Sequence, residues 1–170
     1  EPSGGSIRIA GERINHRSQK DRDRIRASSI GVMAQSGNLV SHLRIRDNLR
    51  LAAHLADTGR SYQGAARTRT APSWAATAEE LGIGQRLDAW PEELSGGESA
   101  RAALAVALAA GPLVLVADEP TGELDAHTEA SLIDQLRAVA ARGVAVIVAS
   151  HSDAVAAGAD RVVRLNERQV

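Results

Sequence analysis

The chain has 170 residues, of which 44% are hydrophobic and 24% are charged, and its formal net charge is −1. This balance argues against a protein that binds polyanions through a basic surface. With two tryptophans, one tyrosine and no phenylalanine, the chain also lacks the aromatic platforms on which single-stranded nucleic acids stack, so we expect no nucleic-acid partner. The absence of cysteine excludes disulfides and thiolate metal sites. No apolar run approaches the length of a membrane span, so any membrane association is expected to go through a partner.

The first half of the chain shows short patterns of both strand and helix. Alternating residues predict a strand, interleaved charges predict a solvated helix, and leucines at helical spacing predict a second helix. The predicted elements are, in order, a half-exposed strand at 5–11, a helix at 17–28, a buried strand at 30–34 and a helix at 39–56. Residues 58–77 are rich in Gly, Ser, Thr and Ala, and we expect a loop or a poorly defined helix there.

The second half predicts a strand–helix–strand unit. Unbroken apolar runs at 113–117 and 144–149 are typical of strands, and the segment between them carries apolar residues on one helical face. Asp125 is placed to begin that helix and Gly143 to end it. Continuous apolar strands joined by an amphipathic helix indicate an α/β fold whose mainly parallel sheet is covered on both faces. Residues 161–165 are expected to add a further strand.

Polar side chains directly follow three of the predicted strands. These residues are Gln35, Asp118 with Glu119, and His151. Ligands of open parallel sheets bind beyond the carboxyl ends of the strands, so this edge is the expected site. A lone histidine is more often structural than catalytic, but His151 at a strand end is placed to donate a hydrogen bond to a γ-phosphate.

The acidic pair Asp118–Glu119 has two interpretations. In the functional one, Asp118 orients Mg²⁺ on the β- and γ-phosphates of a nucleotide, and Glu119 polarises the attacking water as a general base. In the other, the pair is two carboxylates at an exposed strand end. The pair alone does not decide between them.

Residues 94–98, Leu-Ser-Gly-Gly-Glu, also have two interpretations, which are compatible. Ser95 and Glu98 form a capping box for the alanine-rich helix that follows. Capping does not explain Gly96 and Gly97, which cost helix stability in the first turn. Glycines there allow a phosphate to approach the backbone N–H groups of a helix N-terminus.

These segments together resemble the ATPases of ABC transporters. Leu94-Ser-Gly-Gly-Glu98 resembles the signature, Val114-Leu-Val-Ala-Asp-Glu-Pro-Thr-Gly-Glu-Leu-Asp125 resembles the Walker B element with the D-loop, and Ala149-Ser-His151 resembles the switch-histidine element. Gln35 is similar to the glutamine of the Q-loop. The resemblance covers essentially the whole chain. The Asp-Glu-Pro-Thr-Gly run, with Glu98 closing the signature, is similar to exporters of the lipoprotein-release and macrolide-efflux type.

The resemblance implies an architecture and a set of residue roles. The fold is a P-loop NTPase-like ABC ATPase core (1–38 and 111–170) with a helical signature subdomain (39–110). The expected cofactors are ATP and Mg²⁺. The resemblance assigns catalysis to Glu119 and His151, metal binding to Gln35 and Asp118, and ATP binding to Ser95, Gly96, Gly97, Glu98 and Asp125. The signature residues would bind nucleotide that is held by the opposite subunit.

The resemblance also implies partners, a function and a location. It implies an ATP-binding subunit that couples ATP hydrolysis to transport by transmembrane permease subunits. The expected direction of transport is export. A second ATPase subunit completes a head-to-tail dimer at the cytoplasmic face of the inner or plasma membrane, and the membrane is reached through the permease.

One element of the family is missing from the sequence. The phosphate-binding Walker A loop needs G-x-x-x-x-G-K-[ST], and the only lysine, Lys20, has no such context. The chain opens at Glu1 without an initiator methionine, so we interpret it as truncated before that loop; a degenerate gene product is the alternative. We expect the 170-residue polypeptide alone to bind ATP poorly, to hydrolyse none and to be marginally folded. A smaller departure is Val106, where the family often has arginine.

Two other functions stay open at this point. One is an ABC ATPase of DNA repair or translation, although the sequence shows no coiled coil, zinc module or second ATPase domain. The other is a non-catalytic protein that uses only its signature face. The sequence upstream of Glu1 discriminates between an enzyme and such a remnant.

Overall fold

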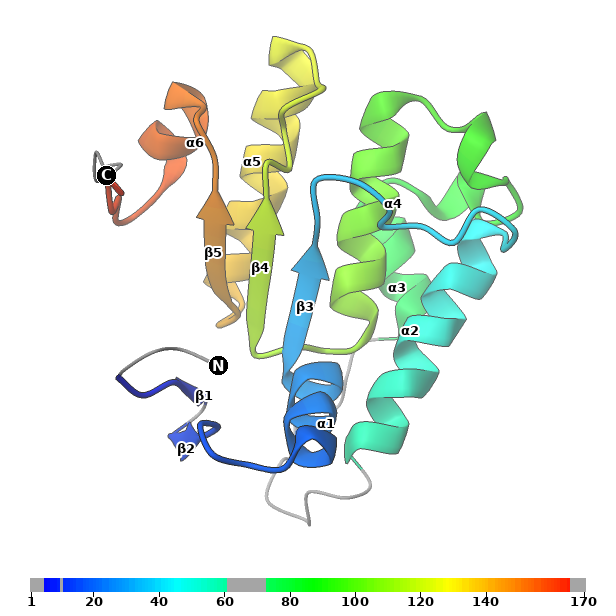
Figure 1. The fold of residues 1–170 in the computed structure, drawn as a ribbon. Helices are drawn as coiled ribbons and strands as arrows, with labels where there is room; N and C mark the ends of the chain where they lie inside the picture. The colour runs from blue at the N-terminus through cyan, green and yellow to red at the C-terminus, as the bar shows by residue number, and fades with distance from the viewer. Residues whose placement is uncertain (1–4, 10, 61–72, 166–170) are drawn as a thin grey trace.

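A three-stranded parallel sheet forms the centre of the molecule. The computed structural model describes residues 5–9, 11–60 and 73–165. Strands β3 (Ile30–Met33), β4 (Val114–Asp118) and β5 (Ala145–Ala149) lie in the order β3-β4-β5 (Figure 1). In the register, Val32 lies opposite Val116, which lies opposite Ile147. The predicted α/β class with a parallel sheet is confirmed.

The predicted strand–helix–strand unit forms as expected. Helix α5 (Ala126–Ala141) connects β4 to β5 and lies behind the strands in Figure 1. Asp125 caps its first turn, and Gly143, with φ of 83°, follows its end in the left-handed conformation that glycine adopts without strain. Local signals in the sequence therefore define this unit at both ends. Helix α6 (Asp153–Gly158) follows β5 after a cap by Ser152.

Several helices pack together beside the sheet. They are α2 (Ile45–Arg60), α3 (Trp74–Glu80), the 3₁₀ turns η1 (Gly84–Arg86) and η2 (Pro91–Glu93), and α4 (Gly96–Ala109). Helix α4 is rich in alanine and buried over most of its length, and it contacts β3. At Gly31 a Cβ atom would meet the carbonyl oxygen of Ala107 at 2.4 Å, so a glycine in β3 permits this close approach.

One prediction in this region needs correction. The helix expected over 39–56 begins only at Ile45, because the side chain of Asn48 accepts from the N–H of Val40 and donates to the carbonyl of Leu43, which fixes residues 40–44 as a turn. The segment 58–77, expected to be a loop or a poorly defined helix, contains the end of α2 and the start of α3. Its residues 61–72 lie outside the described part of the chain.

The N-terminal segment forms a small hairpin and a charged helix. Strands β1 (Arg8–Ile9) and β2 (Glu12–Arg13) pair antiparallel, so the strand predicted at 5–11 is present but shorter than expected, because the chain reverses at Gly11, where φ is 82°. Helix α1 (Gln19–Ser29) is capped by Ser18, and its charged side chains are exposed or half-buried, whereas Ile25, Ser28 and Ser29 are buried. The predicted solvated helix is confirmed.

Residues 161–165 do not form the predicted strand. None of the described strands pairs with them, and a strand needs a neighbour to satisfy its backbone groups. Their apolar side chains are exposed, up to 91% for Leu165. Within the described residues, no helix is long and apolar enough to cross a membrane.

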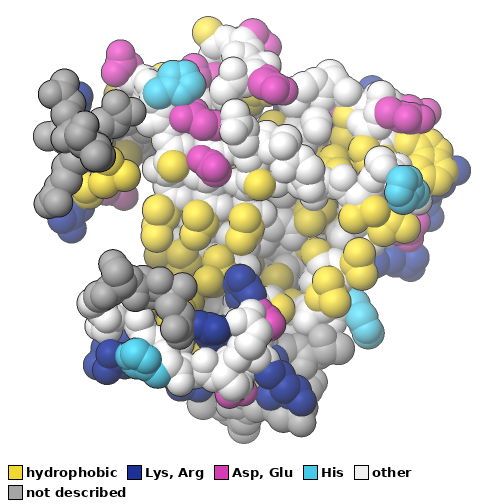
Figure 2. Space-filling view, viewed as in Figure 1, with side chains coloured by type: hydrophobic (Ala, Val, Ile, Leu, Met, Phe, Trp, Pro, Cys, Tyr) yellow, Lys and Arg dark blue, Asp and Glu magenta, His cyan; other side chains and the backbone are white. Residues whose placement is uncertain are grey.

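The helices cover only one face of the sheet. Leu115 and Ala117 of β4 are fully buried against residues of α4 and α5. Val32 and Ile147 point to the opposite side and are 54% and 57% exposed. Figure 2 shows apolar side chains lying open over the strands on this face. The prediction that both faces are covered is therefore wrong for the described residues, because α4 and α5 pack on the same side.

Candidate nucleotide site

The carboxyl ends of the three parallel strands deliver polar residues to one edge of the sheet. Gln35 follows β3, Asp118 ends β4 and Glu119 comes next, and His151 follows β5. Gln35, Asp118 and His151 are exposed, and Glu119 is half-buried. The loop that carries Gln35 is closed by Asn38, whose side chain bonds both the N–H and the carbonyl of Ala34 (2.7 and 2.6 Å).

Glu119, Ser150 and His151 form a hydrogen-bonded cluster at this edge. The Oε1 atom of Glu119 accepts from the backbone N–H of His151 (3.1 Å) and lies 3.0 Å from His151 Nδ1. Its Oε2 atom accepts from the hydroxyl of Ser150 (3.1 Å). Glu119 has φ of 45°, a left-handed conformation that costs free energy for a non-glycine residue and that recurs at functional sites. The ends of β4 and β5 are therefore joined through one carboxylate.

The charges in this cluster stabilise each other. The hydrogen bond from His151 holds the pKa of Glu119 below its usual value, with further help from the Ser150 hydroxyl. The same bond and the negative charge of Glu119 raise the pKa of His151. Opposite shifts on the two partners are what an ion pair produces. Glu119 is thus kept as a carboxylate, the form that accepts a hydrogen bond from water.

Residues 94–98 form the turn at the start of α4, which we term the signature turn. The Oγ atom of Ser95 accepts from the N–H of Glu98 (3.3 Å), and Oε2 of Glu98 accepts from the N–H of Ser95 (2.9 Å), so the predicted capping box is present. Arg86 of η1 donates from Nε to the other carboxylate oxygen of Glu98 (2.7 Å). The backbone N–H of Ser95 and then the Arg86 side chain lower the pKa of Glu98 to about 2.

The two glycines of the signature turn have different surroundings. A Cβ atom at Gly97 would lie 2.6 Å from Cγ2 of Thr128, so close packing of α4 on α5 already requires a glycine there. A Cβ atom at Gly96 would meet only Leu124, at an ordinary 3.8 Å. Packing therefore explains why residue 97 is a glycine. It does not explain the glycine at 96, for which the approach of a phosphate is the remaining interpretation.

Asp125 holds the start of α5 beside the signature turn. Its Oδ1 atom accepts from the N–H groups of His127 and Thr128 (3.0 Å each), and its Oδ2 atom accepts from the Thr128 hydroxyl (2.7 Å). These bonds, led by the hydroxyl of Thr128, lower the pKa of Asp125. Since Thr128 also faces Gly97, Asp125 and the signature turn share one neighbour.

The expected metal ligands fit a hydrated cation rather than a closed protein cage. No group of three or more His, Cys, Asp or Glu side chains able to hold a metal occurs among the described residues. Mg²⁺ keeps several waters and takes one or two carboxylates plus substrate phosphates, so the exposed oxygens of Asp118 and Gln35 suit it.

Sequence reasoning missed three residues that complete these contacts. Ser150 binds Glu119, Arg86 binds Glu98, and Glu129 accepts from the hydroxyl of Ser152 (2.7 Å). Ser150 sits beside His151 after an apolar run, which was a usable signal. Arg86 and Glu129 carry no motif that points to their partners.

Comparisons with known proteins identify the family of the chain. The family model described as ABC transporter matches residues 1–122. The chain belongs to this family. It is 34% identical over 166 residues to an uncharacterized ABC transporter ATP-binding protein of Mycobacterium tuberculosis, covering 97% of this chain and 64% of that protein. The chain thus spans about 64% of the length of the first curated relatives it matches.

The relatives include both exporter types that the sequence resembles. The chain is 36% identical to the lipoprotein-releasing system ATP-binding protein LolD of Paramagnetospirillum magneticum (98% of this chain, 71% of LolD). It is 35% identical to the macrolide export ATP-binding/permease protein MacB of Rhodopirellula baltica (98% and 24%). Among solved structures, a bacterial ABC transporter cassette determined as a dimer matches with a TM-score of 0.74 and 27% identity, covering 93% of this chain and 67% of the cassette. The same cassette was also solved with ADP and Pi.

Proposed function

We propose that this chain is part of the ATP-binding subunit of an ABC transporter, which couples ATP hydrolysis to export by partner membrane subunits. The observation that carries the proposal is the cluster of Glu119, Ser150 and His151 beside Asp118, at the carboxyl edge of a parallel sheet in a member of this family. This edge is where ligands of such sheets bind.

Each polar residue of the edge has a role in this proposal. Asp118 and Gln35 hold hydrated Mg²⁺, which when bound neutralises charge on the β- and γ-phosphates. Glu119 is the general base that accepts a hydrogen bond from the attacking water. Its Oε2 atom accepts from Ser150 and has a further lone pair for that water. The Nδ1 atom of His151 contacts Glu119, which leaves the Nε2 atom of His151 to donate a hydrogen bond to the γ-phosphate.

The signature turn acts on nucleotide held by the opposite subunit of a head-to-tail dimer. Ser95 with the backbone N–H groups near Gly96 and Gly97 binds the γ-phosphate at the N-terminus of α4. Glu98 shapes this turn through the capping box, and Asp125 lies in the loop that crosses to the other subunit. A relative solved as a dimer supports this arrangement.

The helices beside the sheet connect the ATPase to the membrane. In this proposal, residues 39–110 form the subdomain that docks on a transmembrane permease, and residues 1–38 and 111–170 form the ATPase core. The protein then lies at the cytoplasmic face of the membrane, held there by the permease. The relatives LolD and MacB support export as the direction.

The test is the ATPase activity of the protein expressed from its complete open reading frame. Substituting Glu119→Gln removes the base and keeps the shape, so we expect kcat to fall by about 10² to 10⁴ while ATP binding persists. The matched control is Asp160→Asn, which removes one exposed carboxylate beyond α6 and is expected to leave kcat unchanged. Wild-type hydrolysis by the Glu119→Gln variant, or an inactive wild-type protein, would refute the proposal.

A further inference from the structure

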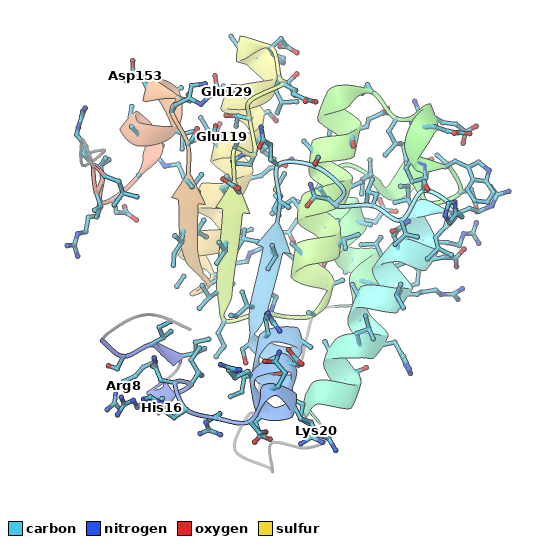
Figure 3. All side chains as sticks on the ribbon, viewed as in Figure 1. Arg8, His16, Lys20, Glu119, Glu129 and Asp153 are labelled. Carbon is cyan, nitrogen blue, oxygen red and sulfur yellow. The ribbon has the colours of Figure 1, made fainter. Side chains whose placement is uncertain are left out.

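A second carboxylate contacts the loop that carries His151. Glu129 lies on α5, one turn after Asp125, and is half-buried. Its Oε1 atom accepts from the hydroxyl of Ser152 at 2.7 Å. Figure 3 places Glu119 and Glu129 at the same end of the sheet, next to the start of α6 where Asp153 lies. The loop at residues 150–152 is therefore bonded to α5 as well as to the end of β4.

Ser152 connects three parts of the structure through one hydroxyl and one N–H. Its Oγ donates to Glu129 and accepts from the N–H of Val155 (3.4 Å), which caps the first turn of α6. Its backbone N–H donates to Oγ of Ser150 (3.1 Å), and Ser150 in turn donates to Glu119. A continuous chain of hydrogen bonds therefore runs from Glu129 through Ser152 and Ser150 to Glu119, and His151 lies between the two serines in the sequence.

A second contact fixes the far end of α6 on the same face of α5. A Cβ atom at Gly158 would lie 2.7 Å from Cγ2 of Ile133, so the glycine permits a close approach of the two helices. Ile133 lies four residues after Glu129, one helical turn further on. A helix of six residues is too short to be stable by itself, so its position depends on these contacts with α5.

We propose that Glu129 is a positioning residue, which holds the 150–152 loop so that His151 meets Glu119. The inference rests on the proposed function and assigns Glu129 a part in it. A charged acceptor gives a stronger bond to Ser152 than a neutral one. The negative charge of Glu129 also adds slightly to the raised pKa of His151, after the larger effects of Glu119. Since Asp125 caps α5 one turn before Glu129, the helix links Asp125 to the loop that carries His151.

The first experiment compares Glu129→Ala with Glu129→Gln in the protein from the complete open reading frame. Loss of the acceptor in the alanine variant misplaces His151, so we expect kcat for ATP hydrolysis to fall roughly tenfold or more while KM for ATP changes by less than about twofold. The glutamine side chain accepts the same hydrogen bond, so this variant is expected to keep kcat within about twofold of wild type. The control Asp134→Ala removes an exposed carboxylate from the same helix and is expected to leave kcat unchanged.

A double-mutant cycle shows whether Glu129 acts through His151. In the His151→Ala background, Glu129→Ala is expected to lower kcat no further, because the group that it positions is gone. An equal loss in both backgrounds, or an unchanged kcat in the single Glu129→Ala variant, overturns the proposal.

A second readout does not depend on hydrolysis. The ring ¹⁵N resonances of His151, assigned by comparison with His151→Ala, report its contact with Glu119. Glu129→Ala is expected to shift them toward those of a solvent-exposed histidine, and Glu129→Gln is expected to leave them near wild type. Unshifted resonances refute the positioning role whatever the activity. Failure of the proposed function shows separately, as hydrolysis that survives Glu119→Gln.

Discussion

Glu98 connects the signature turn to the helices before it, and its replacement gives a quantitative test of that link. In Glu98→Ala, the N–H of Ser95 and the Nε of Arg86 both lose their acceptor. A lost hydrogen bond to a charged group costs about 1.5–3 kcal/mol, and the partial exposure of the Glu98 side chain (19%) places the expected loss of unfolding free energy at the lower end, about 1.5 kcal/mol. Glu98→Gln keeps an acceptor for Ser95, so a smaller loss is expected.

The pH dependence of this stabilisation has a definite sign. Hydrogen bonds from Ser95 and Arg86 lower the pKa of Glu98 from 4.5 to about 2 in the folded chain. The folded state therefore favours the carboxylate, and its contribution is fully present above about pH 4.5 and is lost as the pH falls toward 2. The glutamine side chain in Glu98→Gln does not titrate, so this variant lacks that pH-dependent contribution to stability.

The assay is denaturant unfolding of the wild type and Glu98→Gln, followed by tryptophan fluorescence. Both tryptophans of the chain, Trp74 and Trp90, lie among the helices beside the signature turn. The difference in unfolding free energy between the two proteins is expected to be largest near pH 7 and to shrink by about 1 kcal/mol near pH 3.5. A difference that stays the same at both pH values would refute the reasoning.

Three further predictions concern packing. Leu104 is fully buried, so Leu104→Ala is expected to lower the unfolding free energy by about 2–5 kcal/mol in the same denaturant assay. In Gly97→Ala the new methyl group meets Thr128, and we expect a loss of about 1–3 kcal/mol by that assay; a stability equal to wild type would show that α4 and α5 are less closely packed than the structure has them. Ile147 is 57% exposed, so Ile147→Thr is expected to reduce the fluorescence of a bound apolar dye and to change stability by less than about 0.5 kcal/mol.

Local signals predicted the central elements well. The apolar runs that became β4 and β5 are unbroken, and the helix between them has its cap and its glycine stop within the same stretch of sequence. Parallel strands bring their carboxyl ends together, so Glu119 and His151 were expected at the same edge of the sheet, and there their side chains contact each other.

Contacts between distant residues could not be predicted from local patterns. Arg86 lies 12 residues before Glu98, and Glu129 lies 23 residues before Ser152, and each pair is formed only by the packing of separate elements. Residues 161–165 have the composition of a strand, but composition does not supply a pairing partner. The unbroken apolar pattern of β5 predicted burial on both faces, whereas the described helices cover one.

The structure distinguishes two reasons for glycine in the signature turn that the sequence alone could not tell apart. Both glycines cost helix stability in the first turn of α4, and both were equally open to the phosphate interpretation. The contact with Thr128 gives Gly97 a packing reason, which would select glycine in a protein that never bound nucleotide. Gly96 has no such reason, since a Cβ atom there meets only Leu124 at 3.8 Å. Within the signature turn, the argument for a phosphate contact therefore rests on Gly96, because only there does the fold leave the choice of glycine unexplained.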